Sequence, residues 1–271
     1  FDVYSPTNMN RQIACFTETL GRKKSEVVRE TILRINPSAE VTAYAELLPH
    51  DRIAGLMAEA DFVFPAADDL AFSIILFRET QRLGKPALMV NPAGGWAHVS
   101  VILPGRPSIE EMEGVPRLGS YEALQEMLAI RRYRLGTYFY ALWGDWRIDY
   151  YRGFIEEDWR PTQLCPMVWL ASCIGAFEVL KVLSGKWKPV ASPRYWEITA
   201  GKVRIRRING PGLYTLLVWQ RRLMWRIFQT PLGPALEWMQ GIWWTLFLRW
   251  RGFCEVRRER RAAARAIGGR P

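Results

Sequence analysis

Short apolar runs alternate with amphipathic helical patterns between residues 25 and 103, and this alternation limits the fold more than any other feature of the chain. Residues 25–35 carry apolar side chains at helical spacing. The run DFVFPAA at 61–67 has the continuous apolar character of a buried parallel strand, and KPALMV at 85–90 is a second candidate strand. The β-α-β-α-β order predicts an α/β fold with a doubly wound, Rossmann-like and mainly parallel sheet.

Four further segments extend this α/β unit. The stretch VTAYAELL at 41–48 is a candidate strand, and residues 121–135 form a predicted helix. Residues 166–184 form a nearly all-apolar helix, which we expect to be buried because it is too short, and too charged at its end, to span a membrane. Residues 194–208 are typical of a β-hairpin.

The character of the chain changes near Asn209-Gly210-Pro211-Gly212, a run of turn-forming residues. Two apolar helices rich in Trp and Arg are predicted beyond it. We therefore divide the chain into an α/β domain at 1–210 and a helical extension with a basic tail at 211–271. Packing, a partner surface and contact with a membrane surface through 213–253 all remain open as roles for the extension.

The net charge of +10 is concentrated at one end of the chain. Residues 249–271 contain eight arginines against two glutamates. Nucleic-acid binding would therefore rest on this tail rather than on the fold. The four cysteines are widely scattered and form no C-x-x-C pair, which argues against a four-thiolate zinc site and favours a reducing, cytoplasmic setting.

Several polar residues lie where a nucleotide would bind in a doubly wound sheet. Asp2 occupies the position of the acidic residue that binds ribose hydroxyls at the end of the second strand. On that interpretation the first strand, the glycine-rich loop and the first helix precede residue 1. Asn8, Arg11 and Lys24 would face the phosphates, and Asp68, after the apolar run at 61–67, could hold Mg²⁺.

These residues belong to a longer ordered series of short motifs. The series comprises Asp2, Asn8, Arg11-Gln12, Gly21, Lys24, INP at 35–37, Asp68 and GKP…GG at 84–95. It resembles the ThiF-type superfamily, the adenylating enzymes related to ubiquitin-activating enzymes. The apolar helix at 166–184 is also similar to the closing helix of that family, so the resemblance covers residues 1–205. Each motif alone is weak, and the specificity lies in their order.

The resemblance implies ATP-dependent activation of a carboxylate, often the C-terminus of a ubiquitin-like protein or a peptide. It implies that Asp2 holds the ribose, that Asn8 and Arg11 contact the phosphates, and that Lys24 stabilises charge on the reacting phosphates. It further implies that Asp68 binds magnesium and that Gln12 supports the loop. The products would be an acyl-adenylate and pyrophosphate, and a homodimer is expected.

The sequence departs from the family pattern at several points. The glycine-rich loop is not in the chain, so the resemblance does not imply activity of this chain alone. The paired C-x-x-C zinc ligands of some members are also missing. Asp69 stands where Asn is common in the family, and Ala67 where Thr is common.

Simpler roles remain for some of these residues. Arg11 and Lys24, taken singly, are typical solvated charges, and Asp68-Asp69 is a typical helix N-cap. Cys165 lies in the connection where some members carry a catalytic cysteine. Cys173 is expected in the core, and His50 and His98 are expected as isolated surface or loop residues.

Three other functions, each of a different class, would use some of the same residues. The TN-x-NRQI motif at 7–13 also resembles the tRNA threonylcarbamoyladenosine dehydratases of the same superfamily, and the basic tail would suit tRNA. A non-catalytic scaffold with a ThiF-like fold is a further alternative. A nicotinamide dehydrogenase would share the ribose-binding acid but would not explain Arg11, Lys24 and Asp68 together.

Overall fold

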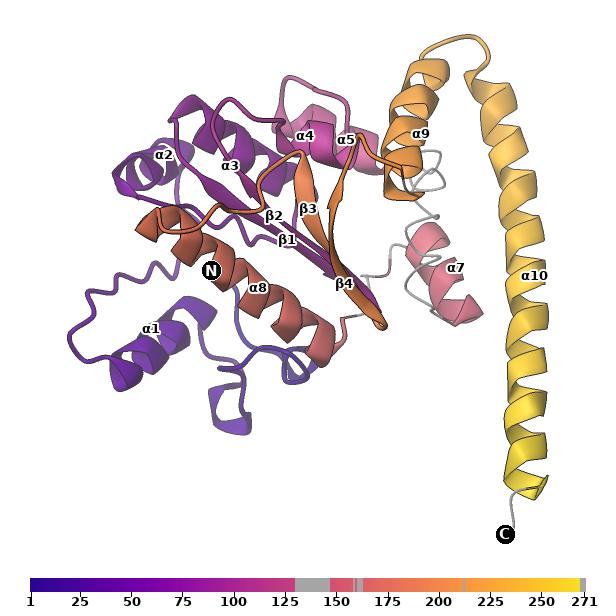
Figure 1. Ribbon diagram of the computed structural model, residues 1–271, viewed down its shortest axis with the longest axis horizontal. Helices are drawn as coiled ribbons and strands as arrows, with labels where there is room; N and C mark the ends of the chain where they lie inside the picture. The colour runs from indigo at the N-terminus through magenta and orange to yellow at the C-terminus, as the bar shows by residue number, and fades with distance from the viewer. Residues whose placement is uncertain (130–146, 158, 160–162, 212, 269–271) are drawn as a thin grey trace.

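The computed structural model describes residues 1–129, 147–157, 159, 163–211 and 213–268 (Figure 1). In this part of the chain one sheet of four strands is formed, in the order β1-β2-β3-β4, with every neighbouring pair antiparallel. The predicted hairpin is confirmed as β3 and β4, and the turn at Gly94-Gly95 joins β1 to β2. The strands are β1 (Ala87–Ala93), β2 (Trp96–Ile102), β3 (Arg194–Thr199) and β4 (Lys202–Arg207).

The helices predicted at 25–35 and 166–184 are observed with bounds within one residue of the prediction, whereas the helices at 109–113 and 148–156 were not predicted. Residues 130–135 of the helix predicted at 121–135 lie outside the described part of the chain. The α-helices are α1 (Lys24–Ile35), α2 (His50–Glu59), α3 (Leu70–Arg82), α4 (Ile109–Glu113), α5 (Tyr121–Ala129), α7 (Ile148–Glu156), α8 (Cys165–Ser184), α9 (Leu213–Phe228) and α10 (Gly233–Gly268), and two short 3-10 helices are η1 (Pro6–Asn8) and η2 (Thr17–Thr19).

The sheet is covered on both faces, as Figure 1 shows, with α3, α4 and α5 on one side and α8 on the other. β2 is buried along its whole length because alternate side chains enter the two cores. Val99 and Val101 pack with Ala171 of α8, whereas Ile102 packs with Ile74 of α3. The layered α/β arrangement that the sequence predicts is therefore present.

The prediction of a mainly parallel sheet is wrong for the described residues. The run 61–67 reaches β1 in a parallel orientation, but it makes only the isolated bridge between Val63 and Ala87. Pro65 follows two residues later and has no N–H group to continue the ladder. Residues 41–48, the other candidate strand, contain no strand. The Rossmann-like interpretation is therefore not confirmed by the strand order.

Helix α8 is buried along one narrow face only, which corrects the expectation of a buried helix. Among the described residues it is the one helix long and apolar enough to cross a membrane, but its inner face packs on β1 and β2. Glu178 on that inner face is fully buried and accepts hydrogen bonds from Lys181 Nζ and Trp196 Nε1, both at 2.7 Å. Cys173 lies on the outer face and is exposed, so its assignment to the core is wrong.

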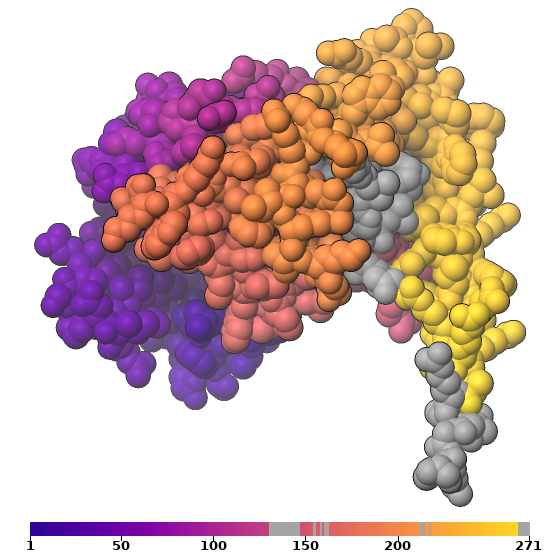
Figure 2. Space-filling model, viewed as in Figure 1, coloured from indigo at the N-terminus to yellow at the C-terminus, as the bar shows by residue number. Residues whose placement is uncertain are grey.

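The C-terminal helices attach to the α/β unit through α9. The guanidinium of Arg221 donates to the carbonyl oxygen of Glu113 at the end of α4 (2.8 Å). Gly114 follows with a φ of 70°, and a Cβ there would lie 2.7 Å from the carbonyl oxygen of Val218. Helix α10 then packs along α9 and α7, and Figure 2 shows its C-terminal end extending beyond the rest of the molecule.

Candidate functional site

The first candidate group is an ion pair between Asp2 and Lys24. The backbone of Val3 bridges to Lys23, and the Lys24 N–H donates to the Asp2 carbonyl oxygen at 2.9 Å. This pairing sets the Lys24 ammonium group, in the first turn of α1, against the Asp2 carboxylate. The hydrogen bond from Lys24 lowers the pKa of Asp2, so the carboxylate is ionised at neutral pH.

The loop between Asp2 and α1 is shaped by Asn8. The side chain of Asn8 is buried, and its Oδ1 accepts from the backbone N–H of Ser5 at 3.1 Å. Its carbonyl oxygen accepts from the N–H groups of both Arg11 and Gln12. Asn8 therefore holds the turn that presents the next two predicted site residues, and Gln12 takes part through its backbone.

Arg11 retains donors that an anion could use. Its Nη1 donates to the carbonyl oxygen of Thr7 (2.8 Å) and to Asn10 Oδ1 (2.9 Å). These two bonds fix the guanidinium on its own loop, and within the described part of the chain they use Nη1 alone, which leaves Nη2 and Nε for a ligand. Planar, paired N–H donors of this kind suit a phosphate.

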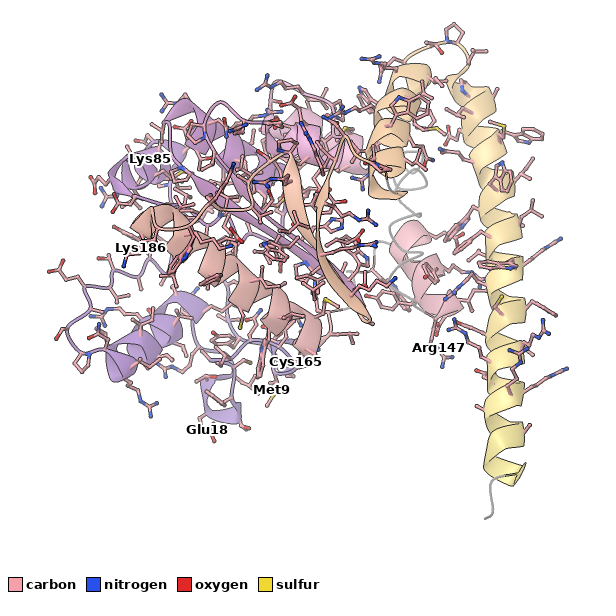
Figure 3. The ribbon with its side chains drawn as sticks, viewed as in Figure 1. Met9, Glu18, Lys85, Arg147, Cys165 and Lys186 are labelled. Carbon is pink, nitrogen blue, oxygen red and sulfur yellow. The ribbon has the colours of Figure 1, made fainter. Side chains whose placement is uncertain are left out.

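The loop is tied to the rest of the molecule by residues that the sequence reasoning missed. Trp169 Nε1 of α8 donates to the Arg11 carbonyl oxygen at 2.8 Å. Asn10 Nδ2 donates to the Gln163 carbonyl oxygen at 3.1 Å, and Gln163 Nε2 donates to the Pro92 carbonyl oxygen at 2.9 Å. In Figure 3 the labelled Met9 and Cys165 accordingly lie at the same end of α8. Two of these contacts join positions more than 150 residues apart, the third joins positions 71 residues apart, and no local motif marks them.

Asp68 comes from a separate element and is exposed just before α3. Its neighbour Asp69 is the N-cap of α3 and accepts from the Phe72 N–H at 2.9 Å, which confirms the N-cap interpretation for Asp69. Asp69 also accepts from the Tyr121 hydroxyl at 2.7 Å and from Gln125 Nε2 at 3.3 Å. Burial opposes ionisation of Asp69, but these hydrogen bonds outweigh it and lower the pKa of that carboxyl.

The candidate residues include the types of group that bind a nucleotide and magnesium, with Asp2, Arg11 and Lys24 on one loop and Asp68 on a separate element. Within the described ranges, no three His, Cys, Asp or Glu side chains cluster in a way that would hold a metal by themselves. Magnesium bound with a nucleotide commonly takes only one or two protein carboxylates and completes its shell with phosphate and water. Asp68 is accessible enough to act as such a ligand, and Lys24 and Arg11 supply positive charge.

An open hollow along α1 is poorly suited to bind the phosphates of a nucleotide. It is lined by Glu26, Arg29, Glu30 and residues 41–43. Because the lining carries two carboxylates and only one guanidinium, its net negative charge would repel a triphosphate. We therefore do not assign the nucleotide to it.

The thiol and imidazole candidates have different surroundings. Cys165 is the first residue of α8 and is half-buried. His98 is buried between the rings of Trp96 and Tyr195, which corrects the expectation of a surface residue. It lies in β2, a strand covered on both faces, and burial lowers the pKa of His98 to about 3. His50 is exposed at the start of α2, as expected.

Comparison with known proteins gives one family match and several partial similarities. A profile of the ThiF family matches residues 1–212. The chain is 21% identical over 214 residues to the sulfur carrier protein ThiS adenylyltransferase of Escherichia coli K12, which covers 75% of this chain and 69% of that protein. It is 32% identical over 90 residues to the tRNA threonylcarbamoyladenosine dehydratase of the same organism, which covers 33% of this chain and 34% of that enzyme.

The fold is similar to that of MccB from Escherichia coli, solved with ATP, with a TM-score of 0.53 and 18% sequence identity. The similarity covers 76% of this chain and 53% of MccB, so the chain spans about half the length of that protein. MccB has also been solved with MccA. At this identity the likeness concerns the fold alone.

Proposed function

Because the chain belongs to the ThiF family, we propose that it acts in the ATP-dependent adenylation of a carboxylate. The observation that carries the proposal is the Asp2–Lys24 ion pair beside the Arg11 loop. Tyr4, Cys15 and Val27 form one apolar cluster that packs this loop against α1. An acidic group for a ribose and two cations for phosphates are thus held on one small unit.

In this proposal each residue has a defined task. The exposed Asp2 carboxylate accepts hydrogen bonds from ribose hydroxyls. Arg11 and Lys24 stabilise negative charge on the phosphates while a substrate carboxylate oxygen attacks the α-phosphorus. The new carboxyl oxygen–phosphorus bond forms as the bond to pyrophosphate breaks. A magnesium ion held by Asp68 would neutralise charge on the phosphate oxygens.

We propose that the carboxylate is the C-terminus of a small carrier protein, ubiquitin-like in kind, or of a peptide. The similarity to the adenylyltransferase of the sulfur carrier protein ThiS supports this substrate class. The similarity to a tRNA threonylcarbamoyladenosine dehydratase supports a second candidate, in which the carboxylate is carried by tRNA. The second candidate predicts tRNA binding that weakens steeply as salt rises.

The outer face of α8 supports a proposed homodimer. Trp169, Phe177, Leu180 and Leu183 are between 49% and 57% exposed on this face. A continuous apolar face of this kind is typical of a protein interface. Phe177→Glu combined with Leu180→Glu should convert a dimer to a monomer in sedimentation velocity. A chain that is monomeric before the substitution would contradict the proposal.

A cytoplasmic location is also proposed. It is supported by the four cysteines, all of which are free thiols: Cys15, Cys165, Cys173 and Cys254. A reporter fusion that is active only outside the cytoplasm would contradict it.

Pyrophosphate exchange into ATP tests the enzymatic proposal. The assay uses the chain with whatever sequence its gene encodes around it, Mg²⁺, and a panel of carrier proteins, peptides with free C-termini, and tRNA. Exchange should depend on one substrate of the panel and should fall at least about a hundredfold in Arg11→Ala and Asp68→Ala. Arg22→Ala is the matched control, since Arg22 lies on the same loop but pairs with Glu30 at 2.5 Å.

The outcomes separate the alternatives. Exchange that needs tRNA would favour the dehydratase-like candidate over the carrier-protein substrate. If no substrate of the panel supports exchange and the chain does not bind ATP, adenylation would be contradicted. A scaffold with a ThiF-like fold would then remain. Equal losses in Arg11→Ala and Arg22→Ala would contradict the specific task assigned to Arg11.

A further inference from the structure

Helix α10 has one face fixed by contacts with the rest of the chain. Trp244 is buried, and its Nε1 donates to Glu156 of α7 at 2.9 Å. Glu255 accepts from the backbone N–H of Ile148 at 2.8 Å, and the guanidinium of Arg251 lies 5.2 Å from the centre of the Tyr151 ring. The opposite face of α10 is therefore held outward, as the side chains in Figure 3 show.

The outward face carries a continuous apolar stripe. Apart from the adjacent pair Ile242 and Trp243, successive members are three or four residues apart, which places them on one side of the helix. From the first to the last of them the helix rises about 22 Å. The stripe consists of Trp238, Ile242, Trp243, Leu246, Trp250 and Phe253, each between 41% and 72% exposed.

The stripe leads directly into a cluster of positive charge. Arg249 is exposed within it, and Arg257, Arg260 and Arg261 are exposed just beyond its end. In the described part of α10 the acidic residues are Glu237, Glu255 and Glu259. The C-terminal end of the helix, which extends beyond the body in Figure 2, is therefore strongly cationic.

We propose that the outward face of α10 docks on an anionic lipid bilayer and lies in its interfacial layer. Tryptophan rings have an apolar body and a polar N–H, and they are favoured at the boundary between headgroups and acyl chains. Ile242, Leu246 and Phe253 would enter the acyl region between them. The exposed arginines at the end of the stripe complement anionic headgroups.

Two other occupants account less well for the same residues. RNA would use the arginines and could stack on tryptophan, but it gives no role to Ile242 and Leu246. A second copy of the chain would cover the apolar stripe, but α10 has few carboxylates to face the arginine cluster of its partner. The lipid surface uses both features at once.

Vesicle co-sedimentation of the full chain tests this proposal without nucleotide, so its outcome is independent of the proposed adenylation. The chain should bind vesicles of phosphatidylcholine mixed with phosphatidylglycerol, and should bind pure phosphatidylcholine at least about tenfold more weakly. Trp243→Glu with Trp250→Glu should weaken binding to the mixed vesicles by at least about tenfold. Leu47→Glu with Phe64→Glu, at positions 66% and 53% exposed, is a control with the same change of charge.

A third variant separates charge from apolar contact. Replacing Arg257, Arg260 and Arg261 together by Gln should remove most of the preference for the anionic lipid. Urea unfolding of every variant checks that the exposed substitutions leave the fold intact. Trp243→Ser with Trp250→Ser, which adds no charge, should also weaken binding.

Several results would overturn the proposal. The first is that the chain does not bind the mixed vesicles. The second is that the Leu47 and Phe64 control loses as much vesicle binding as the tryptophan variants. The third is that both tryptophan variants bind the vesicles as well as the parent chain. Binding of tRNA that the tryptophan variants abolish, without vesicle binding, would assign the stripe to RNA. A dimer that those variants dissociate, again without vesicle binding, would assign it to a second copy of the chain.

Discussion

Replacement of Glu178 by Leu should destabilise the protein strongly. The Glu178 side chain is fully buried, and both of its oxygens accept hydrogen bonds, one from the Val190 N–H at 2.7 Å and the other from Lys181 and Trp196. Leu would leave two N–H donors and an ammonium group without their acceptor. Removing one partner from a buried ionic network costs about 3–5 kcal/mol, so we expect a loss of ~4 kcal/mol in the free energy of unfolding.

Urea unfolding followed by circular dichroism would measure this change. Glu178→Gln keeps an acceptor and should lose only about half as much, and adding Lys181→Met to Glu178→Leu should recover part of the loss. Glu126→Gln on the exposed side of α5 is a control that should stay within about 0.5 kcal/mol of the parent. A loss below about 1 kcal/mol in Glu178→Leu would refute the assigned role of this carboxylate.

Three further predictions concern the site and its scaffold. Trp169→Phe removes the N–H that holds the Arg11 carbonyl, so KM for ATP should rise roughly fivefold with kcat unchanged in steady-state assays. Asp69→Ala removes the N-cap of α3 and the Tyr121 contact and should cost about 1–2 kcal/mol in thermal unfolding, whereas Asp69→Asn should cost less. Because the folded protein keeps His98 neutral to about pH 3 while the unfolded chain takes up its proton near 6.5, His98 should lower the free energy of unfolding by about 1.4 kcal/mol for each pH unit between about 6.5 and 3. His98→Phe should remove that slope.

Local sequence patterns predicted helices such as α1 and α8 and the C-terminal hairpin, because each depends on neighbouring residues, but they did not predict α4 and α7. The N-cap at Asp69 is an example, since its partner Phe72 lies within the same turn. The direction of strand pairing was not predictable in this way. A continuous apolar run shows that a strand is buried on both faces, and β2 meets that condition in an antiparallel sheet. The same burial explains why His98 was wrongly expected at the surface.

The sequence and the family resemblance indicated individual candidate residues, but not the contacts among them. Sequence order alone indicated Asp2 and Lys24, and the structure joins them in an ion pair. The roles toward a nucleotide and its magnesium ion remain predictions for all six candidates: Asp2, Asn8, Arg11, Gln12, Lys24 and Asp68. The support from Trp169 was not predictable, because its contact joins positions far apart in the chain and has no repeated pattern.

Transfer of an oxygen atom from substrate to AMP tests the central claim most directly. The carrier protein or peptide that supports pyrophosphate exchange would be labelled with ¹⁸O in its C-terminal carboxylate and incubated with ATP, Mg²⁺ and hydroxylamine. Attack of that carboxylate on the α-phosphorus predicts AMP that carries one labelled oxygen, together with the hydroxamate of the substrate. Unlabelled AMP, or ADP as the product, would contradict carboxylate adenylation.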